Sequence, residues 1–132
     1  MKTKNLYLCL LLLASLLVAC GAPALAEPVA IAQGFWDAVN AKNIDAAMAF
    51  VADDVVIRGG PNHLSSKADL SAFMSSELAK GITFEISDLV LSSEDEVTYT
   101  MKVYTNDTML VSSPFLRIQV KDEKIVLVEF PL

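Results

Sequence analysis

The spacing of hydrophobic positions changes twice along the chain. Residues 6–19 form one apolar run, broken only by Ser15. Between residues 28 and 81 the apolar positions recur every three or four residues, as they do on one face of a helix. From Ile82 onward they alternate with polar positions, which is the period of a half-buried strand. The pattern therefore predicts an apolar leader, then helices, then strands.

Two helices are predicted at the start of the folded region. The first opens at Pro28, a residue that suits the first turn of a helix, and the second follows Asn43, a natural N-cap. Val51 continues the apolar spacing of this second helix, and the two acidic residues 53–54 are expected to end it. A short strand is predicted at residues 55–57, because three β-branched residues follow one another there.

A third helix and four strands complete the pattern. Ser66 and Asp69 have the spacing of a capping box, and Gly81 is placed to end the helix. The predicted strands cover residues 82–87, 97–103, 108–120 and 125–130. Pro114 marks a bulge or an edge position in the third of them. Helices gathered before a meander of strands predict an α+β fold, with three N-terminal helices packed on a strongly curved antiparallel sheet.

The leader is typical of an export signal. Two lysines precede its 14 positions, and it is shorter than the roughly 20 residues that a membrane-spanning helix needs. It ends in Leu17-Val18-Ala19-Cys20, which resembles the lipobox of bacterial lipoprotein signal peptides. The resemblance implies cleavage before Cys20, a diacylglyceryl thioether on its sulfur and an acyl chain, such as palmitate, on its amino group. There are two alternatives. The first is an ordinary signal peptide in which the cysteine is incidental, and the second is a transmembrane anchor.

The leader divides the chain into a signal peptide at residues 1–19, a lipidated tether at residues 20–27 and a domain at residues 28–132. Such a protein is exported and held on the lipid bilayer through acylated Cys20, since each buried methylene contributes about 0.8 kcal/mol. The membrane that carries this anchor is the cell membrane, or the outer membrane, facing the periplasm, if the source is Gram-negative. Gly21 stands where an aspartate retains many lipoproteins at the inner membrane, which favours the outer membrane.

Charge and cysteine content narrow the choice of partners. Removal of the leader takes two of the ten basic residues and none of the sixteen acidic ones, which leaves a net charge of −8. Such an acidic domain repels nucleic acid, so no nucleic-acid partner is expected. With one histidine and with Cys20 lipidated, the residues provide no usual zinc site, and neither a metal nor a cofactor is expected.

Two stretches of the chain carry the pattern of a known family. Residues 35–55 combine an aromatic helix, a polar turn, a second helix and an Ala-Asp-Asp-Val end that leads into a strand. Residues 122–126 resemble the usual turn into the final strand. Together they resemble the nuclear transport factor 2-like (NTF2-like) superfamily, in its branch of small bacterial domains related to ketosteroid isomerase and polyketide cyclases. The resemblance implies a cone-shaped α+β barrel around an apolar pocket, often paired with a second copy through the sheet.

The chemistry of ketosteroid isomerase is not expected here. That mechanism uses a carboxylate base, with a tyrosine and a protonated carboxylic acid that stabilise the oxyanion. The resemblance places the tyrosine at Phe35, the base at Gly59 and the acid at Phe115, and none of these side chains can transfer a proton. The expected function is therefore non-catalytic binding of a small apolar ligand or of a partner protein.

Two alternatives stay open beside this expectation. The first is an enzyme of isomerase, cyclase or dehydratase type that uses Asp37, Arg58 or His63. The second is a structural accessory subunit. An open pocket would favour binding or catalysis, and a filled one would favour assembly. The residues predicted to contact a ligand are Trp36, Phe50, Arg58, His63, Phe73, Met74, Tyr99, Met101 and Phe115. Core filling is the competing role for the apolar ones.

The penultimate strand contains a conflict of register. Within residues 116–120 apolar and polar residues alternate, yet the family register turns Phe115, Arg117 and Gln119 toward the pocket. Either a bulge near Pro114 shifts the register, or the outer face of the sheet is itself apolar. Because the last strand is also apolar on both faces, we expect a homodimer through the sheet.

Overall fold

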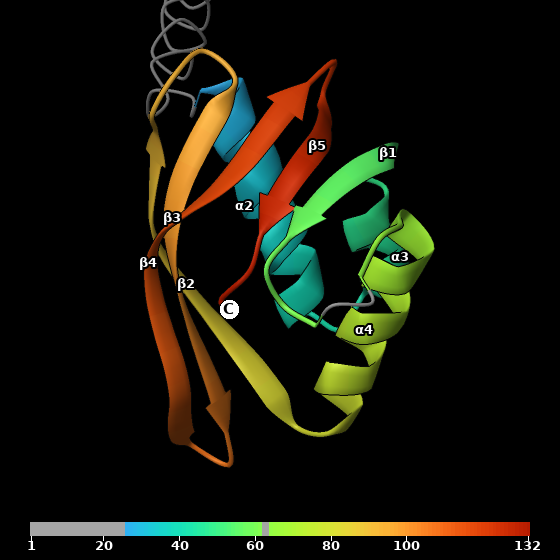
Figure 1. Ribbon diagram of the computed structural model, residues 1–132, viewed down its shortest axis with the longest axis vertical. Coiled ribbons are helices and arrows are strands. Elements are labelled where there is room, and N and C mark those ends of the chain that lie inside the picture. Colours follow the sequence, from blue (N-terminus) through green and yellow to red (C-terminus); the bar gives the residue numbers. More distant parts are fainter. Residues whose placement is uncertain (1–25, 62–63) are drawn as a thin grey trace, which may run out of the picture.

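The fold is seen in a computed structural model that describes residues 26–61 and 64–132 (Figure 1). Predictions that concern residues 1–25 and 62–63, among them those for Cys20 and His63, lie outside the described residues. The helices are α2 (Glu27–Asn40), α3 (Ile44–Met48) and α4 (Lys67–Ala79). The strands are β1 (Val51–Arg58), β2 (Ile82–Leu91), β3 (Glu96–Thr105), β4 (Thr108–Lys121) and β5 (Lys124–Glu129). The predicted α+β class is confirmed.

Side-chain caps begin two of the helices, as the local sequence predicts. The Asn43 side chain accepts a hydrogen bond from the backbone N–H of Ala46 at 3.1 Å, which starts α3. The Ser66 hydroxyl accepts one from the backbone N–H of Asp69, also at 3.1 Å, which starts α4. Gly81 follows α4 with a φ of +81°, a conformation that favours glycine. The predicted roles of Asn43, Ser66 and Gly81 are therefore confirmed. Each could be predicted because it depends only on residues close in the sequence.

The second helix is shorter than predicted. It ends at Met48, and Val51 begins β1 instead of continuing the helix. The physical reason is a distant partner: the backbone N–H of Ile125 donates to the carbonyl of Phe50 at 2.8 Å, and Val51 pairs with Ile125. Val51 is buried in the strand, so extended backbone and packing outweigh its helical spacing. The acidic pair at residues 53–54 therefore lies in β1 and does not end a helix.

The five strands form one sheet in the order β1-β5-β4-β3-β2. The pairs β2–β3, β3–β4 and β4–β5 are antiparallel, and β1 joins β5 in parallel. The prediction of four antiparallel strands is thus confirmed, and the short first strand joins them in parallel. The sheet is curved and does not close on itself, and the helices cover one of its faces (Figure 1). This is the cone-shaped arrangement that the family resemblance implied, and it is called the cone below.

A bulge in β4 resolves the conflict of register. The pairing with β3 shifts between Ser113 and Leu116, so Pro114 and Phe115 together lie opposite one residue of β3. Phe115 adopts a φ of +60° at this point. The bulge predicted at Pro114 is confirmed, and it turns every side chain beyond it to the other face of the sheet.

Beyond the bulge, the apolar side chains of β4 face the core. Ile118 is fully buried and Val120 nearly so. Arg117 and Gln119 lie on the outer face, and the Phe115 side chain is 81% exposed. The family register that turned Phe115, Arg117 and Gln119 toward the pocket is therefore wrong for this chain, because the bulge reverses it.

Candidate functional site

The indole of Trp36 lies at the centre of the cone. Trp36 is fully buried on α2, and four aromatic rings surround it. Their centroids lie 4.9 Å away for Phe35, 5.7 Å for Tyr99, 6.0 Å for Phe84 and 6.1 Å for Phe130. Aromatic pairs at these separations attract one another. The interior of the cone is therefore occupied by the side chains of α2, β2, β3 and the segment after β5.

Phe130 closes the cone from the end of the sheet. Its backbone N–H donates to the carbonyl of Arg58 at 2.8 Å, and the N–H of Gly60 donates to the carbonyl of Pro131 at 2.9 Å. These bonds hold residues 130–132, called the closing segment below, against the end of β1. The Phe130 ring is almost completely buried. It also packs edge-on against Phe73, with centroids 6.0 Å apart.

Gly59 makes this close approach possible. A Cβ added at Gly59 would lie 2.1 Å from the carbonyl oxygen of Phe130, and its φ of +73° is one that side chains disfavour. Any other residue would push the segment away from β1. The position that the resemblance gives to a catalytic base is therefore occupied by a glycine that lets the Phe130 backbone pass.

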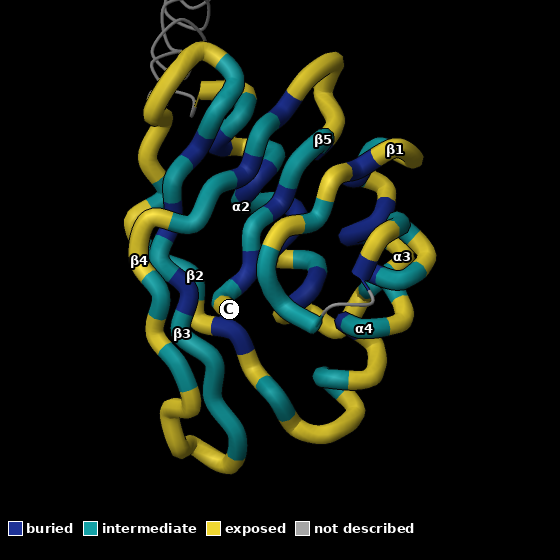
Figure 2. Tube along the Cα trace, in the orientation of Figure 1, coloured by how far each residue is buried: buried dark blue, intermediate teal, exposed yellow. Residues whose placement is uncertain are grey.

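The predicted ligand-contacting residues of the interior are fully packed. Trp36, Met74 and Met101 have no exposed surface, and Tyr99 is 1% exposed. A cavity large enough for a ligand would leave the side chains around it accessible to water. The cone is thus filled by its own side chains, in agreement with the core-filling alternative for these four residues. The residues described along α2 and the facing strands form the buried centre (Figure 2).

The other predicted site residues lie at the margins or on the surface. Phe50 and Phe73 are half-buried against the core. Asp37 is exposed on α2 and accepts a hydrogen bond from Gln33 at 2.8 Å. Arg58 lies at the end of β1, where its side chain is 57% exposed. Among the described residues, no hydrogen bond or ion pair joins Asp37 to Arg58.

The interior offers little acid–base chemistry. Within residues 26–61 and 64–132, no charged side chain is buried. Tyr99 donates its hydroxyl to the backbone carbonyl of Glu129. Burial raises the pKa of the Tyr99 phenol far above its usual range, and the negative charge of Glu129 raises it further. Tyr99 therefore stays protonated and serves as a hydrogen-bond donor to the end of β5.

One buried polar atom has no partner. The indole N–H of Trp36 makes no hydrogen bond in the described part of the chain. An unpaired buried donor costs about 1 to 3 kcal/mol. Apolar contacts with the surrounding rings offset this cost. The interior of the cone is therefore stabilised by close packing and not by hydrogen bonds to the indole.

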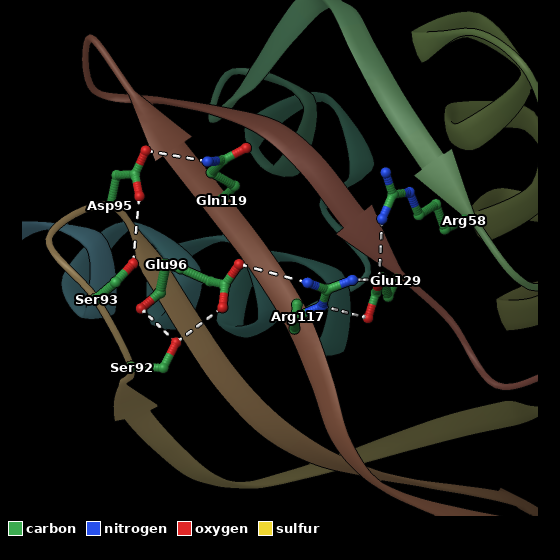
Figure 3. Close-up of polar contacts among 8 residues, drawn as sticks. All are labelled: Arg58, Ser92, Ser93, Asp95, Glu96, Arg117, Gln119 and Glu129. Carbon is green, nitrogen blue, oxygen red and sulfur yellow. Dashed lines mark hydrogen bonds and ion pairs between the residues drawn. The ribbon is translucent and has the colours of Figure 1, made fainter.

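A polar cluster lies outside the cone, on the outer face of the sheet (Figure 3). Arg117 donates to both carboxylate oxygens of Glu129, at 2.7 and 3.2 Å. Arg58 lies 3.8 Å from Glu129, and Glu96 lies 3.8 Å from Arg117. The hydrogen bond and charge of Glu129 raise the pKa of Arg117 above its usual value. The cluster joins β1, β3, β4 and β5 and leaves Arg58 with donors that face solvent.

Sequence reasoning missed this cluster and the role of Phe130. Arg117 and Glu129 are neighbours only when the register of β4 against β5 is known. Phe130 was expected to end the last strand, yet Pro131 beside it has no N–H to continue a ladder. That proline was the signal that the chain leaves the sheet at this point.

No metal or membrane-spanning element is seen in the described ranges. No group of three or more His, Cys, Asp and Glu side chains there is arranged to hold a metal ion. No helix in the same ranges is long and apolar enough to cross a membrane.

Comparison with known families and structures agrees with this geometry. The family of SnoaL-like domains matches residues 32–128. No sequence among the curated proteins matches the chain.

Several solved structures share the fold at low sequence identity. The Δ5-3-ketosteroid isomerase from Mycobacterium sp. superposes with a TM-score of 0.63 and 19% identity, over 80% of this chain and 92% of that one. An uncharacterized cystatin fold protein from Novosphingobium aromaticivorans gives 0.67 and 16%, over 83% and 100% of the two chains. An LEH-like epoxide hydrolase from M. tuberculosis gives 0.61 and 15%, over 83% and 80%. At these identities the likeness concerns the fold.

Proposed function

The chain belongs to the family of SnoaL-like domains, and on that premise we propose that it is a lipid-anchored, non-catalytic domain that acts by binding another protein. The filled cone carries this proposal. Trp36, Met74, Met101 and Tyr99 leave no room for a ligand among them, and Phe130 closes the space that remains. A domain whose described residues leave no interior pocket acts through its surface.

The residues that line the cone also support a non-catalytic role. A general acid or base must reach its substrate with a group that can exchange a proton. Phe35 and Gly59 cannot do so, and the phenol of Tyr99 is held in its neutral form by burial. Asp37 is exposed and hydrogen-bonded to Gln33 instead of facing the interior.

The sheet is the surface that we propose for contact with other proteins, including a second copy of the chain. Apolar side chains remain exposed along it: Val56 is 50% exposed, Val90 57% and Phe115 81%. Phe115 also has a left-handed backbone conformation. An exposed aromatic ring and a strained backbone are both unfavourable in a free surface, so their occurrence at one residue supports a role in an interface.

The proposed anchor is acylated Cys20, on the cell membrane or on the outer membrane of a Gram-negative source. The lipobox-like Leu17–Cys20 stretch supports it, and α2 begins only seven residues after Cys20. Mass spectrometry of the membrane-extracted protein should find an N-terminal Cys20 carrying a diacylglyceryl group. Cys20→Ser should leave the protein unacylated. An intact leader, or an unmodified Cys20, would contradict the anchor.

One observation favours a second candidate function, the binding of a small apolar molecule. The unpartnered indole N–H of Trp36 could donate to the oxygen of a ligand that displaced Phe130. Such a ligand would have to break the backbone bonds that hold the closing segment, and Phe130 would have to leave the core. The second candidate therefore predicts binding only after the cone opens.

Two assays separate these functions. We expect the full chain in detergent neither to bind estradiol-17β-hemisuccinate nor to isomerise a Δ5-3-ketosteroid above the rate in buffer. Phe130→Ala, which opens space beside Trp36, should bind the steroid better than the parent, and Leu132→Ala should not. Saturable binding to the parent protein would favour the apolar-ligand function, and isomerisation by the parent protein would overturn the non-catalytic proposal.

A further inference from the structure

A hollow lies on the rim of the cone, outside the packed interior. Its walls come from the ends of β1 and β5, from β4 and from the closing segment, and its volume is about 260 Å³. The residues that line it are Arg58, Gly59, Leu116, Glu129, Phe130 and Leu132. The fully buried residues around Trp36 do not belong to this set. A ligand could therefore occupy this hollow, called the rim pocket below, without opening the cone.

Arg58 brings hydrogen-bond donors to the rim pocket that the domain itself does not use. Its ion-pair partner is Glu129, with Nη1 and Oε1 3.8 Å apart, which is beyond hydrogen-bond length. Both carboxylate oxygens of Glu129 already accept from Arg117, at 2.7 and 3.2 Å. Figure 3 shows the other terminal nitrogen of Arg58 turned away from Glu129. Within residues 26–61 and 64–132 the Arg58 side chain makes no hydrogen bond.

This state of Arg58 is unusual among the cationic side chains that the structure describes. Most of the others are used within the domain, four by carboxylates at 2.7 to 3.2 Å and one by a backbone carbonyl: Lys67, Lys80, Lys102, Arg117 and Lys124. Lys42 lies in the turn between α2 and α3, and Lys121 shares its hollow with four acidic residues. Arg58 therefore combines unused donors with a hollow that has apolar walls.

The charges beside the rim pocket favour an anion. Two cationic side chains and one acidic one, Arg58, Arg117 and Glu129, give a net charge of +1. Glu96 completes the cluster, and Figure 3 shows Arg117 between it and Glu129. Because Arg117 already neutralises Glu129, an anion that approaches Arg58 meets little repulsion there. The acidic groups elsewhere on the domain are screened beyond about 8 Å at physiological salt.

The size and the walls of the rim pocket select a short acid. The fork of an arginine and a planar carboxylate form two parallel hydrogen bonds. Leu116 and Phe130 provide apolar walls, and Gly59 adds backbone without a side chain. A volume of about 260 Å³ holds about nine non-hydrogen atoms, at roughly the 30 Å³ that a water molecule takes in the liquid.

We propose that the rim pocket binds a short, water-soluble monocarboxylate. Its carboxylate accepts from the unused donors of Arg58, and its hydrocarbon chain packs against Leu116 and Phe130. A phosphate dianion would bring more negative charge toward Glu129 and gain no apolar contact. This inference goes beyond the proposed function and does not depend on it. Estradiol-17β-hemisuccinate also carries a carboxylate, but its steroid exceeds the volume of the pocket, so the parent protein is still expected not to bind it.

The test is an NMR titration of the isotopically labelled full chain in neutral detergent, with hexanoate as the probe. We expect saturable shifts of the Gly59 amide and of the Arg58 Nε–H signal. Hexanamide, which has the same shape without the charge, should bind about tenfold more weakly, because hydrogen bonds to charged groups are the stronger ones. Acetate should also bind more weakly than hexanoate, because it buries almost no apolar surface.

A matched pair of variants tests the role of Arg58. Arg58→Gln should weaken the binding of hexanoate by about tenfold, for the same reason as hexanamide. Arg58→Lys should bind with intermediate affinity, because an ammonium group keeps the charge but not the fork. Lys42→Gln is the control, since it removes an exposed cation outside the rim pocket, and it should leave binding unchanged.

Four outcomes would overturn the inference. They are no saturable shift with hexanoate, hexanoate bound no more tightly than hexanamide or acetate, binding that Arg58→Gln leaves intact, or equal losses in Arg58→Gln and Lys42→Gln. The last would show a general attraction to positive charge. None of these outcomes touches the proposed non-catalytic function, which fails instead if the parent protein isomerises the steroid.

Discussion

The ring of Phe130 packs edge-on against the indole of Trp36, with their centroids 6.1 Å apart and their planes at 79°. Trp36 belongs to the first described helix and Phe130 to the segment after the last strand. Their contact therefore joins the two ends of the domain across the space that would otherwise be a pocket. Several expected outcomes depend on it.

Phe130→Ala should lower the free energy of unfolding by about 3 to 5 kcal/mol, the usual cost of removing a buried phenylalanine ring. The loss would be a large fraction of the 5 to 15 kcal/mol that typically stabilises a domain. Leu132→Ala is the matched control in the same segment, because its side chain is fully exposed. Urea denaturation measures both variants. Equal midpoints would show that Phe130 does not support the core.

Gly59→Ala should be much more destabilising than Gly81→Ala. Both glycines have a positive φ, +73° and +81°, so both substitutions carry the left-handed penalty of about 1 to 2 kcal/mol. Only at Gly59 would the new Cβ meet the carbonyl oxygen of Phe130, at 2.1 Å; at Gly81 nothing lies within 4 Å. Thermal denaturation should show the extra loss at Gly59. Equal losses would mean that the closing segment does not pass over Gly59.

Asp69→Asn should destabilise the protein at neutral pH and have less effect in acid. The Asp69 carboxylate accepts hydrogen bonds from the backbone N–H and the hydroxyl of Ser65, at 3.1 and 3.0 Å. The interaction with the Ser66 side chain, followed by these two bonds from Ser65, lowers the pKa of Asp69 in the folded state. Its contribution is therefore present above the unfolded pKa of about 4 and is lost as the pH falls through the lower folded pKa.

Chemical denaturation at several pH values measures this effect. Asp54→Asn, at an exposed position of β1, serves as the control and should change stability little at any of them. A difference between Asp69→Asn and the parent that stayed constant down to the lowest pH would contradict the role of the ionised carboxylate.

Tyr99→Phe should cost stability at neutral pH, and the cost should shrink at alkaline pH. At neutral pH the variant leaves the Glu129 carbonyl without its donor, a loss of about 1 to 2 kcal/mol. Because burial raises the pKa of Tyr99, the unfolded chain ionises first, at about pH 10, and the parent then loses stability as the pH rises. The variant lacks this loss. Parallel curves across pH 9 to about 11 would argue against a buried neutral phenol.

Local features of the fold could be predicted from the sequence, and distant ones could not. Asn43 and Ser66 cap their helices through neighbours three residues away, so a short window contains all the information. Val51 follows the spacing of a helix but lies in β1, because its partner Ile125 is far along the chain. The position of the β4 bulge followed from Pro114.

The candidate site was predicted only as a set of residues. Trp36, Met74, Tyr99 and Met101 do meet in the interior, as their spacing and the family resemblance implied. Whether they line a pocket or fill it depends on Phe130, whose path requires Gly59 and the backbone of β1. A sequence pattern records which side chains are apolar, but it does not record the volume that they leave.

Because of the closing segment, the free energy of unfolding of this domain should not depend on the concentration of apolar molecules around it. A protein completed by a dissociable ligand gains stability in proportion to the logarithm of that ligand's concentration. Here the molecule that completes the interior is Phe130, covalently part of the chain, and dilution cannot remove it. The folded domain should therefore be equally stable in surroundings that are rich or poor in lipophilic molecules.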